Sequence, residues 1–298
     1  MKRLTVLFAA FAAVVLHATT AQAAPQPLSG SAVYYKLGSG GKIEVWNYAS
    51  GGGGGWHKMA VTAGSGQFSA SPDGTKVAWI DDKGRLHVFG SAGDKVVARN
   101  ALYSGPCSTP TWSADSQRVA YTLPSTTESA PVAVVGADGR GARRVGTTLG
   151  VCHLTWSANG RHIAGYAGNT DGVHILDVTT GRSRRAPGIK NANHVQSLSP
   201  DGRNVVVNRL APNAEGGDGS WPFVYRPTVV DTLTGAEVSI PVRGALIGAL
   251  YLPDGRLVVR VKGNSRHILV VLSPQGKELQ RLTEPTLARR MALLGIPG

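Results

Sequence analysis

Carboxylates recur at nearly regular intervals along this 298-residue sequence, and they are the first residues that could do chemistry. An aspartate, or in one copy an asparagine, returns at steps of 42, 44, 42 and 53 residues, at Asp73, Asp115, Asn159, Asp201 and Asp254. Paired carboxylates can act as general acid and base. However, each copy stands in a Ser-Pro-Asp-Gly-like corner, and four copies are followed by a glycine, at Gly74, Gly160, Gly202 and Gly255. Because Asp and Asn cap their own backbone and Gly accepts positive φ, we predict structural turns rather than catalytic acids.

The histidines form no recognisable catalytic motif. Four of the eight fall in one stretch, at His153, His162, His174 and His194, and ordinary surface or packed histidines are the simpler interpretation. The sequence has no P-loop, no H-E-x-x-H and no paired Cys-x-x-Cys, and its glycine run at residues 51–55 lacks the following helix of a dinucleotide site. We therefore assign no catalytic residue, no metal ligand and no cofactor.

The N-terminus has the composition of a secretory signal peptide. A basic start precedes an apolar run over residues 4–16, and Ala21-Gln22-Ala23 matches a cleavage site. We expect residues 1–24 to be removed and residues 25–298 to form one exported domain, extracellular, or periplasmic if the host has an outer membrane. The apolar run is too short to span a bilayer and no second one follows, so we expect no membrane span.

Short strands are the elements that must position these residues. Each corner is followed by a run of β-branched and aromatic residues, such as residues 77–80, and a second turn such as Asp138-Gly139 comes later in each unit. One unit therefore contains four antiparallel strands in about 42 residues, which is typical of a β-propeller blade.

The two ends of the chain supply one further unit. Five marked units cover residues 67–284, while residues 32–35, 42–48 and 56–61 have the pattern of a second, third and fourth strand. Residues 290–294 lie where the next inner strand is due, although a short helix over residues 287–294 is the alternative. The sequence thus predicts an all-β fold, a six-bladed propeller of four-stranded antiparallel blades whose last blade is closed by the N- and C-terminal strands, leaving no open edges.

Two pairs of residues share one register in successive units. Trp112 and Trp156 come just before their corners, so we expect them to pack between blades. Cys107 and Cys152 precede these tryptophans by five and four residues, at the start of adjacent inner strands. Since exported cysteines are commonly paired, we predict an inter-blade disulfide.

The corners resemble the TolB-type propeller repeat, in which an inner strand ends in Trp-Ser-Pro-Asp-Gly followed by Lys or Arg and a short apolar strand. Trp112-Ser113 and Trp156-Ser157 carry its first half, and the corners at Asp73 and Asp201 carry the full Ser-Pro-Asp-Gly. The sequence departs from the pattern at Ala114, Ser116, Ala158, Asn159 and Leu252. The resemblance implies a propeller, but such repeats serve several functions. Peptidases of this kind need an α/β-hydrolase domain with G-x-S-x-G, which the sequence lacks, so we exclude that class.

The charge balance makes attraction to an anionic partner reasonable, with cell-wall polyanions, acidic polysaccharides and membrane surfaces as the candidates. There are 31 Lys and Arg against 18 Asp and Glu, a formal net charge of +13. Antiparallel order places a basic arc on the face that carries the corners, at Arg140, Arg143, Arg144, Arg182, Arg184 and Arg185. We hypothesise that this arc binds an anionic envelope polymer, with general solubility as the alternative role. Export argues against nucleic acid.

The longest insertion, residues 211–226, lies on the other face and ends in the aromatic residues Trp221, Phe223 and Tyr225. Exposed aromatics there would anchor a partner. The alternative is that they begin the returning strand and pack on their own blade.

Two functions remain open. The first is a secreted, non-enzymatic, monomeric propeller that binds a protein or an envelope polymer. The alternative is a lyase or hydrolase whose site is assembled from several blades in the central channel, since such a site leaves no linear motif.

Overall fold

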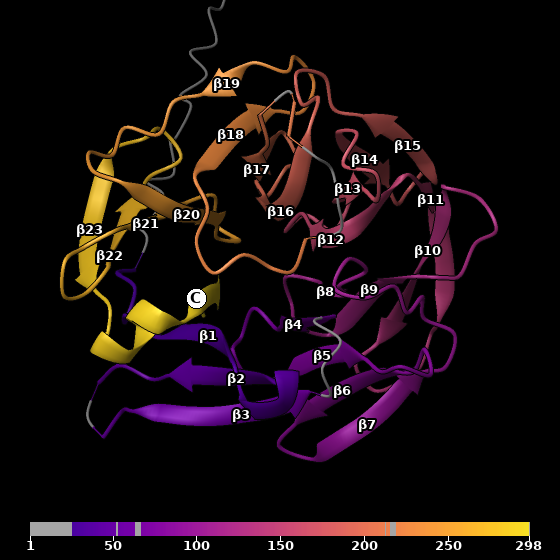
Figure 1. The fold of residues 1–298 in the computed structure, drawn as a ribbon, viewed down its shortest axis with the longest axis horizontal. Coiled ribbons are helices and arrows are strands. Elements are labelled where there is room, and N and C mark those ends of the chain that lie inside the picture. The colour runs from indigo at the N-terminus through magenta and orange to yellow at the C-terminus, as the bar shows by residue number, and fades with distance from the viewer. Residues whose placement is uncertain (1–25, 52, 63–66, 212, 215–218, 298) are drawn as a thin grey trace, which may run out of the picture.

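The computed structural model describes residues 26–51, 53–62, 67–211, 213–214 and 219–297. The expected signal peptide, residues 1–24, lies outside the described residues. Six four-stranded antiparallel sheets form a ring, which confirms the predicted six-bladed propeller (Figure 1). No helix within the described residues is long and apolar enough to cross a membrane.

Blades 1 to 3 follow the first three corners. Blade 1 consists of β4 (Phe68–Ala70), β5 (Val77–Ile80), β6 (Leu86–Gly90) and β7 (Gly93–Ala98). Blade 2 consists of β8 (Thr111–Trp112), β9 (Arg118–Thr122), β10 (Ala130–Gly136) and β11 (Arg143–Thr148). Blade 3 consists of β12 (Gly150–Trp156), β13 (His162–Ala167), β14 (Val173–Asp177) and β15 (Arg182–Arg185).

Blades 4 to 6 complete the ring. Blade 4 consists of β16 (Ala192–Leu198), β17 (Asn204–Arg209), β18 (Pro227–Asp231) and β19 (Glu237–Val238). Blade 5 consists of β20 (Leu246–Tyr251), β21 (Leu257–Val261), β22 (Ile268–Leu272) and β23 (Glu278–Thr283). Blade 6 consists of β1 (Ala32–Leu37), β2 (Ile43–Tyr48), β3 (Trp56–Thr62) and β24 (Ala292–Gly295), with the 3-10 turns η1 (Ser39–Gly41) and η2 (Thr286–Arg290).

The last blade is closed by strands from both ends of the chain. β24 pairs antiparallel with β1, placing Leu293 opposite Tyr34 and Ala292 opposite Tyr35. The C-terminal segment forms a strand rather than the alternative helix, and only the single turn η2 precedes it. Closure pairs the inner edge of β1, which would otherwise present free backbone groups.

The recurring corners have the expected turn chemistry. In the first corner Asp73 Oδ1 accepts hydrogen bonds from the Ser71 hydroxyl and from the Thr75 backbone N–H, and Gly74 has φ +68°. Partial burial raises the pKa of Asp73, but hydrogen bonds from Ser71, Thr75 and Lys76 outweigh it and hold the pKa at about 2. The same Ser-to-Asx bond forms at Asp115, Asn159 and Asp201. The corners join the first two strands of blades 1 to 5, and we call the face that carries them the marker face.

The core lies between neighbouring sheets. Trp112 packs with Ile80 and Leu86 of blade 1, and Trp156 packs with Val132 and Val134 of blade 2. Both tryptophans therefore fill the space between blades, as their register predicts. Burying these side chains is the main force that stacks the blades.

Candidate functional site

The inner strands of all six blades end around one funnel on the marker face. Its cavity has a volume of about 150 Å³. The lining includes Ser69, Trp112, Thr155, Trp156, Ser197, Leu198, Tyr251, Leu252, Leu294 and Ile296. The funnel exists because the inner strands surround the central channel and their last residues line its opening on the marker face.

The funnel is uncharged and largely apolar. Its described lining residues carry hydroxyl, amide, indole or aliphatic groups, with no carboxylate, imidazole, thiol or cationic group among them. Hydroxyls such as those of Ser69, Thr155 and Ser197 can exchange hydrogen bonds with a peptide backbone. This surface suits an uncharged segment of another chain, bound by apolar contact and a few polar groups.

A channel plug, residues 219–225, closes the bottom of the funnel. Trp221 lines the funnel and also lines a second cavity of about 340 Å³ on the opposite face, so its indole separates the two. The Tyr35 hydroxyl donates to the Trp221 carbonyl, and the Gly219 N–H donates to the Tyr166 hydroxyl over 3.3 Å. The Tyr225 hydroxyl donates to the Ala249 carbonyl at 2.9 Å. Blades 3, 5 and 6 thus hold the plug across the axis.

Two aromatic residues of the insertion are not the exposed anchors that the sequence suggests. Trp221 is 8% exposed and Tyr225 is 9% exposed, and only Phe223, at 36%, reaches the surface. The alternative is right only in part: β18 begins at Pro227, after all three aromatics, but Tyr225 packs with Val206 and Val229 of blade 4. The six inner strands leave space at the axis, and burying indole and phenol rings there is more favourable than leaving that space to water.

A buried histidine pair lies against the plug. Nδ1 of His153 is 2.7 Å from Nδ1 of His194, and Nε2 of His194 is 2.9 Å from Oε1 of Gln196. The Trp221 ring centroid lies 5.3 Å from that of His153 and 4.6 Å from that of His194. Burial lowers the pKa of His153 to about 4 and lowers the pKa of His194 well below its ordinary value. Both rings are therefore neutral near pH 7, and one donates to the other.

The other two histidines of that stretch are not brought into the pair. His162 begins β13 and its ring is beside Gly202, while His174 lies on β14. Across the ranges that the structure describes, no group of three or more His, Cys, Asp or Glu side chains could hold a metal ion.

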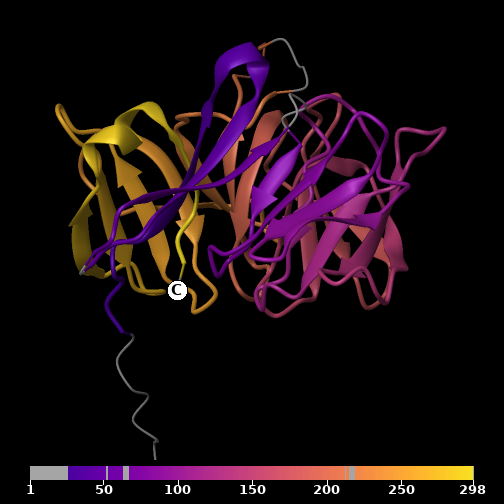
Figure 2. The same ribbon diagram turned by 90° about the horizontal axis from the view of Figure 1, so that it is seen from below.

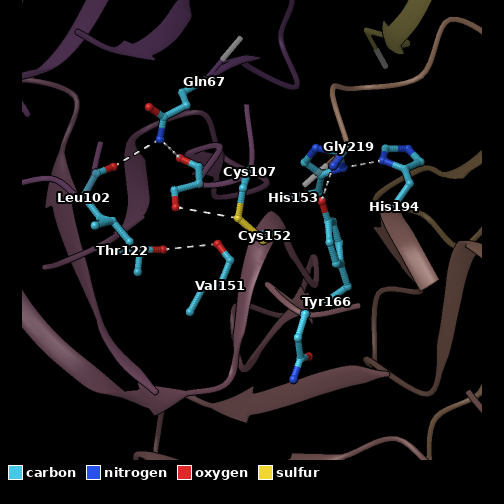
Figure 3. The surroundings of a disulfide bond; sticks show 12 residues. Gln67, Leu102, Cys107, Thr122, Val151, Cys152, His153, Tyr166, His194 and Gly219 are labelled. Carbon is cyan, nitrogen blue, oxygen red and sulfur yellow. Dashed lines mark hydrogen bonds between the residues drawn. A yellow bond between two sulfur atoms is a disulfide. The ribbon is translucent and has the colours of Figure 1, made fainter. Parts of the chain in front are cut away.

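Cys107 and Cys152 lie at disulfide distance, with Cα atoms 4.5 Å apart, between the loop before β8 and the inner strand β12. Figure 3 shows this disulfide beside the histidine pair. The His153 N–H donates to the Cys107 carbonyl over 2.9 Å, and His153 has φ +47°, a conformation that costs energy for a residue with a Cβ. The disulfide therefore fixes the backbone of β12 next to His153, whose ring contacts Trp221 of the plug.

The basic arc begins on the marker face and runs from there along the rim of the ring toward the opposite face. Its residues are Arg140 in the β10–β11 turn, Arg143 and Arg144 on β11, and Arg182, Arg184 and Arg185 on β15. These outer strands are neighbours, since Thr148 Oγ1 and Ser183 Oγ are 2.9 Å apart. The one-face prediction fits Arg140, in the β10–β11 turn, but not Arg185, because β15 crosses the depth of blade 3. At the far end of β15, Nη2 of Arg185 lies 2.5 Å from Oδ1 of Asp171. Asp171 belongs to the β13–β14 connection on the opposite face.

Comparison with known proteins places the fold. No protein-family model matches the sequence. The chain is 38% identical over 55 residues to the Tol-Pal system protein TolB of Francisella tularensis, and this match covers 18% of the chain and only 13% of that relative. The crystal structure of TolB from Acinetobacter baumannii matches with a TM-score of 0.55 at 14% identity, over 91% of this chain and 68% of that chain. The fold is that of a TolB-type β-propeller.

Solved structures of other kinds of protein are also similar to this fold. A nidogen/laminin complex matches with a TM-score of 0.51 at 11% identity, over 88% of this chain and 97% of that chain. The tricorn protease matches with a TM-score of 0.52 at 11% identity, over 88% of this chain and 31% of that chain. A binding complex and a protease therefore share this architecture, and function must be argued from the site.

Sequence reasoning missed the funnel of this propeller. Its lining residues include the corner positions and the residues just before them, such as Ser197, Leu198 and Tyr251. The repeat could have predicted these lining residues. The strand before each corner is the innermost strand of its blade, so its last residues must border the central channel. Conversely, nothing in the spacing indicated that the insertion returns through the centre of the ring.

Proposed function

We propose that this chain is an exported, non-enzymatic, monomeric docking propeller that binds an uncharged segment of a partner protein in the funnel on the marker face. One observation carries the proposal: strand ends from all six blades converge on a single uncharged cavity with a Trp221 floor. A rigid ring of this kind is preorganised, so binding costs little conformational entropy in the propeller.

The chemistry of the funnel supports binding over catalysis. A lyase or hydrolase needs an acid, a base or a nucleophile near the substrate. The described funnel lining offers hydroxyls and apolar groups, while the histidine pair lies buried beneath it with both rings neutral near pH 7. The resemblance to TolB, which its name assigns to the Tol-Pal system, agrees with a protein partner.

A blocked funnel tests the proposal. Ala114 and Ala158 are half-buried residues of the funnel lining. The double variant Ala114→Arg/Ala158→Arg should fill the opening without disturbing the core, because neither side chain is fully buried. Purified wild-type protein lacking residues 1–24, used as bait with the extracellular fraction of its host, should capture a partner that the blocked variant does not.

The matched control adds the same charge elsewhere. Thr126 and Gly168 are exposed in connections on the opposite face, and a Cβ at Gly168 meets no atom within 4 Å. Thr126→Arg/Gly168→Arg should capture the partner as wild type does. Capture by the blocked variant at the wild-type level would place the binding site elsewhere and overturn the funnel proposal.

The basic arc supports a second candidate, binding of an anionic envelope polymer along the rim. Arg143 and Arg182 lie on neighbouring outer strands, both are exposed, and neither has a carboxylate within 4 Å among the described residues. The variant Arg143→Gln/Arg182→Gln should weaken binding to a soluble anionic polymer such as dextran sulfate. Added salt should weaken wild-type binding in the same assay, since exposed charges are screened.

A further inference from the structure

A cationic sector covers part of the opposite face, over blades 4, 5 and 6. It consists of exposed residues from successive strand connections: Arg226, Arg243, Lys262, Arg266, Arg289 and Arg290. The second-to-third and fourth-to-first connections of antiparallel blades all leave on the face away from the corners. The topology therefore gathers these side chains on one surface, distinct from the funnel and from the rim arc.

The positive charge of this sector is not neutralised by nearby acids. Among the residues that the structure describes, no carboxylate lies within 4 Å of its six cationic groups. The carboxylates nearby in sequence are already engaged, since Asp231 pairs with Arg203, Glu237 pairs with Arg209 at 3.4 Å and Glu284 is buried against Arg260.

The positive charges of the sector also act on the neighbouring His267. Burial, followed by the charges of Arg260, Arg289 and Lys262, lowers the pKa of His267 to about 4. On the same face of blades 1 to 3 the connections carry exposed acids and exposed bases together, including Asp82, Glu128 and Asp171 beside Lys83, Arg99 and Lys190. The excess of positive charge on this face therefore lies over blades 4 to 6.

Large apolar side chains project beside the cationic sector. Leu37 is 59% exposed at the end of β1, Leu287 is 58% exposed in η2, and Val224 is 54% exposed in the plug. Figure 2 shows the β1–β2 hairpin, in indigo at the top, extending beyond the loops around it. Leu287 lies two residues before Arg289, so the apolar and cationic groups come from the same connection.

We infer that this face docks on the surface of an anionic lipid bilayer, with the cationic sector attracted to the headgroups and Leu37, Val224 and Leu287 entering the interface. Peripheral membrane binding takes two signals, basic groups near an anionic surface and apolar groups that leave water. A soluble polyanion would gain nothing from the projecting leucines, whereas a bilayer uses both features. The inference does not depend on the funnel, which lies on the other side of the ring.

Co-sedimentation with vesicles tests the inference. Wild-type protein lacking residues 1–24 should bind vesicles of phosphatidylcholine mixed with phosphatidylglycerol, and should bind pure phosphatidylcholine weakly. Added salt should reduce the binding. The variant Arg243→Gln/Lys262→Gln/Arg266→Gln should lower the partition coefficient roughly a hundredfold, since each basic residue near an anionic surface contributes about a fivefold factor.

Two further variants separate a bilayer from other anions. Arg140→Gln/Arg143→Gln/Arg182→Gln removes the same charge from the rim and should leave vesicle binding unchanged. Leu37→Ser/Leu287→Ser should lower vesicle binding about tenfold while leaving binding to dextran sulfate unchanged. Equal vesicle binding by the wild type and the sector variant would overturn the inference, and so would a leucine variant that binds vesicles as wild type does. Circular dichroism on each variant shows that the comparison is between folded proteins.

Discussion

The Nε–H of Arg260 donates to Oε2 of Glu284 over 2.9 Å, and both side chains are buried. The remaining guanidinium donors reach the carbonyls of Met291 and Ala288, and the Tyr34 hydroxyl donates to Oε1 of Glu284. This ion pair therefore joins blade 5 to both chain ends that build blade 6.

Glu284→Gln should lower the free energy of unfolding by about 3 to 5 kcal/mol, because it leaves the charge of Arg260 buried without a partner. Urea denaturation followed by tryptophan fluorescence measures the change. The control Glu278→Gln breaks the exposed pair with Arg281 and should leave the denaturation midpoint where it is. Equal midpoints for Glu284→Gln and wild type would show that this pair does not hold the closure.

Deleting residues 289–298 should sharply lower the melting temperature. The deletion removes β24, exposes the inner edge of β1 and takes away Met291, Leu293 and Ile296 from the core next to blade 5. Differential scanning calorimetry would detect the loss. A melting curve that matches the full-length protein would mean that strand closure contributes little to stability.

Replacing both cysteines, as Cys107→Ala/Cys152→Ala, should destabilise the protein by about 4 kcal/mol, the entropy expected for a cross-link that closes a loop of this length. Peptide mapping without reductant should recover the two cysteine peptides as one cross-linked species from exported protein. Recovery of both thiols in free form would contradict the predicted disulfide.

Stability should fall as the pH drops from about 6.5 to about 4. In this window the unfolded protein protonates its histidines, whereas burial keeps the pKa of His153 at about 4 and that of His194 lower still. The unfolded state therefore binds more protons, and His153 alone accounts for a loss of roughly 3 kcal/mol.

The pair of substitutions His153→Asn/His194→Gln should reduce this pH dependence, measured as melting temperature against pH. Asn is chosen at position 153 because it tolerates the positive φ of that residue. His57 is exposed, so His57→Gln should retain the wild-type slope. An unchanged slope in the double variant would show that the buried pair does not cause the acid sensitivity.

The sequence alone determined the number of blades and the strand order within them. Blade number and strand order were predictable because each corner is a turn stabilised by hydrogen bonds between residues close in sequence. These turns are centred on Asp73, Asp115, Asn159, Asp201 and Asp254. The periodic tryptophans Trp112 and Trp156 were predictable for the same reason, since their register within the repeat decides which neighbour they meet. The repeat also predicted that the C-terminal segment would join β1.

Only the tertiary structure decided where the insertion lies and what surrounds it. The contacts of Trp221 with His153 and His194, and of its carbonyl with Tyr35, join residues of three blades far apart in the chain. The course of β15 across the depth of blade 3 likewise depends on tertiary packing, and it places Arg185 at the opposite face beside Asp171. Local turns fix the period of a propeller, but the space left at its axis depends on how all six blades pack together, and no single repeat contains that information.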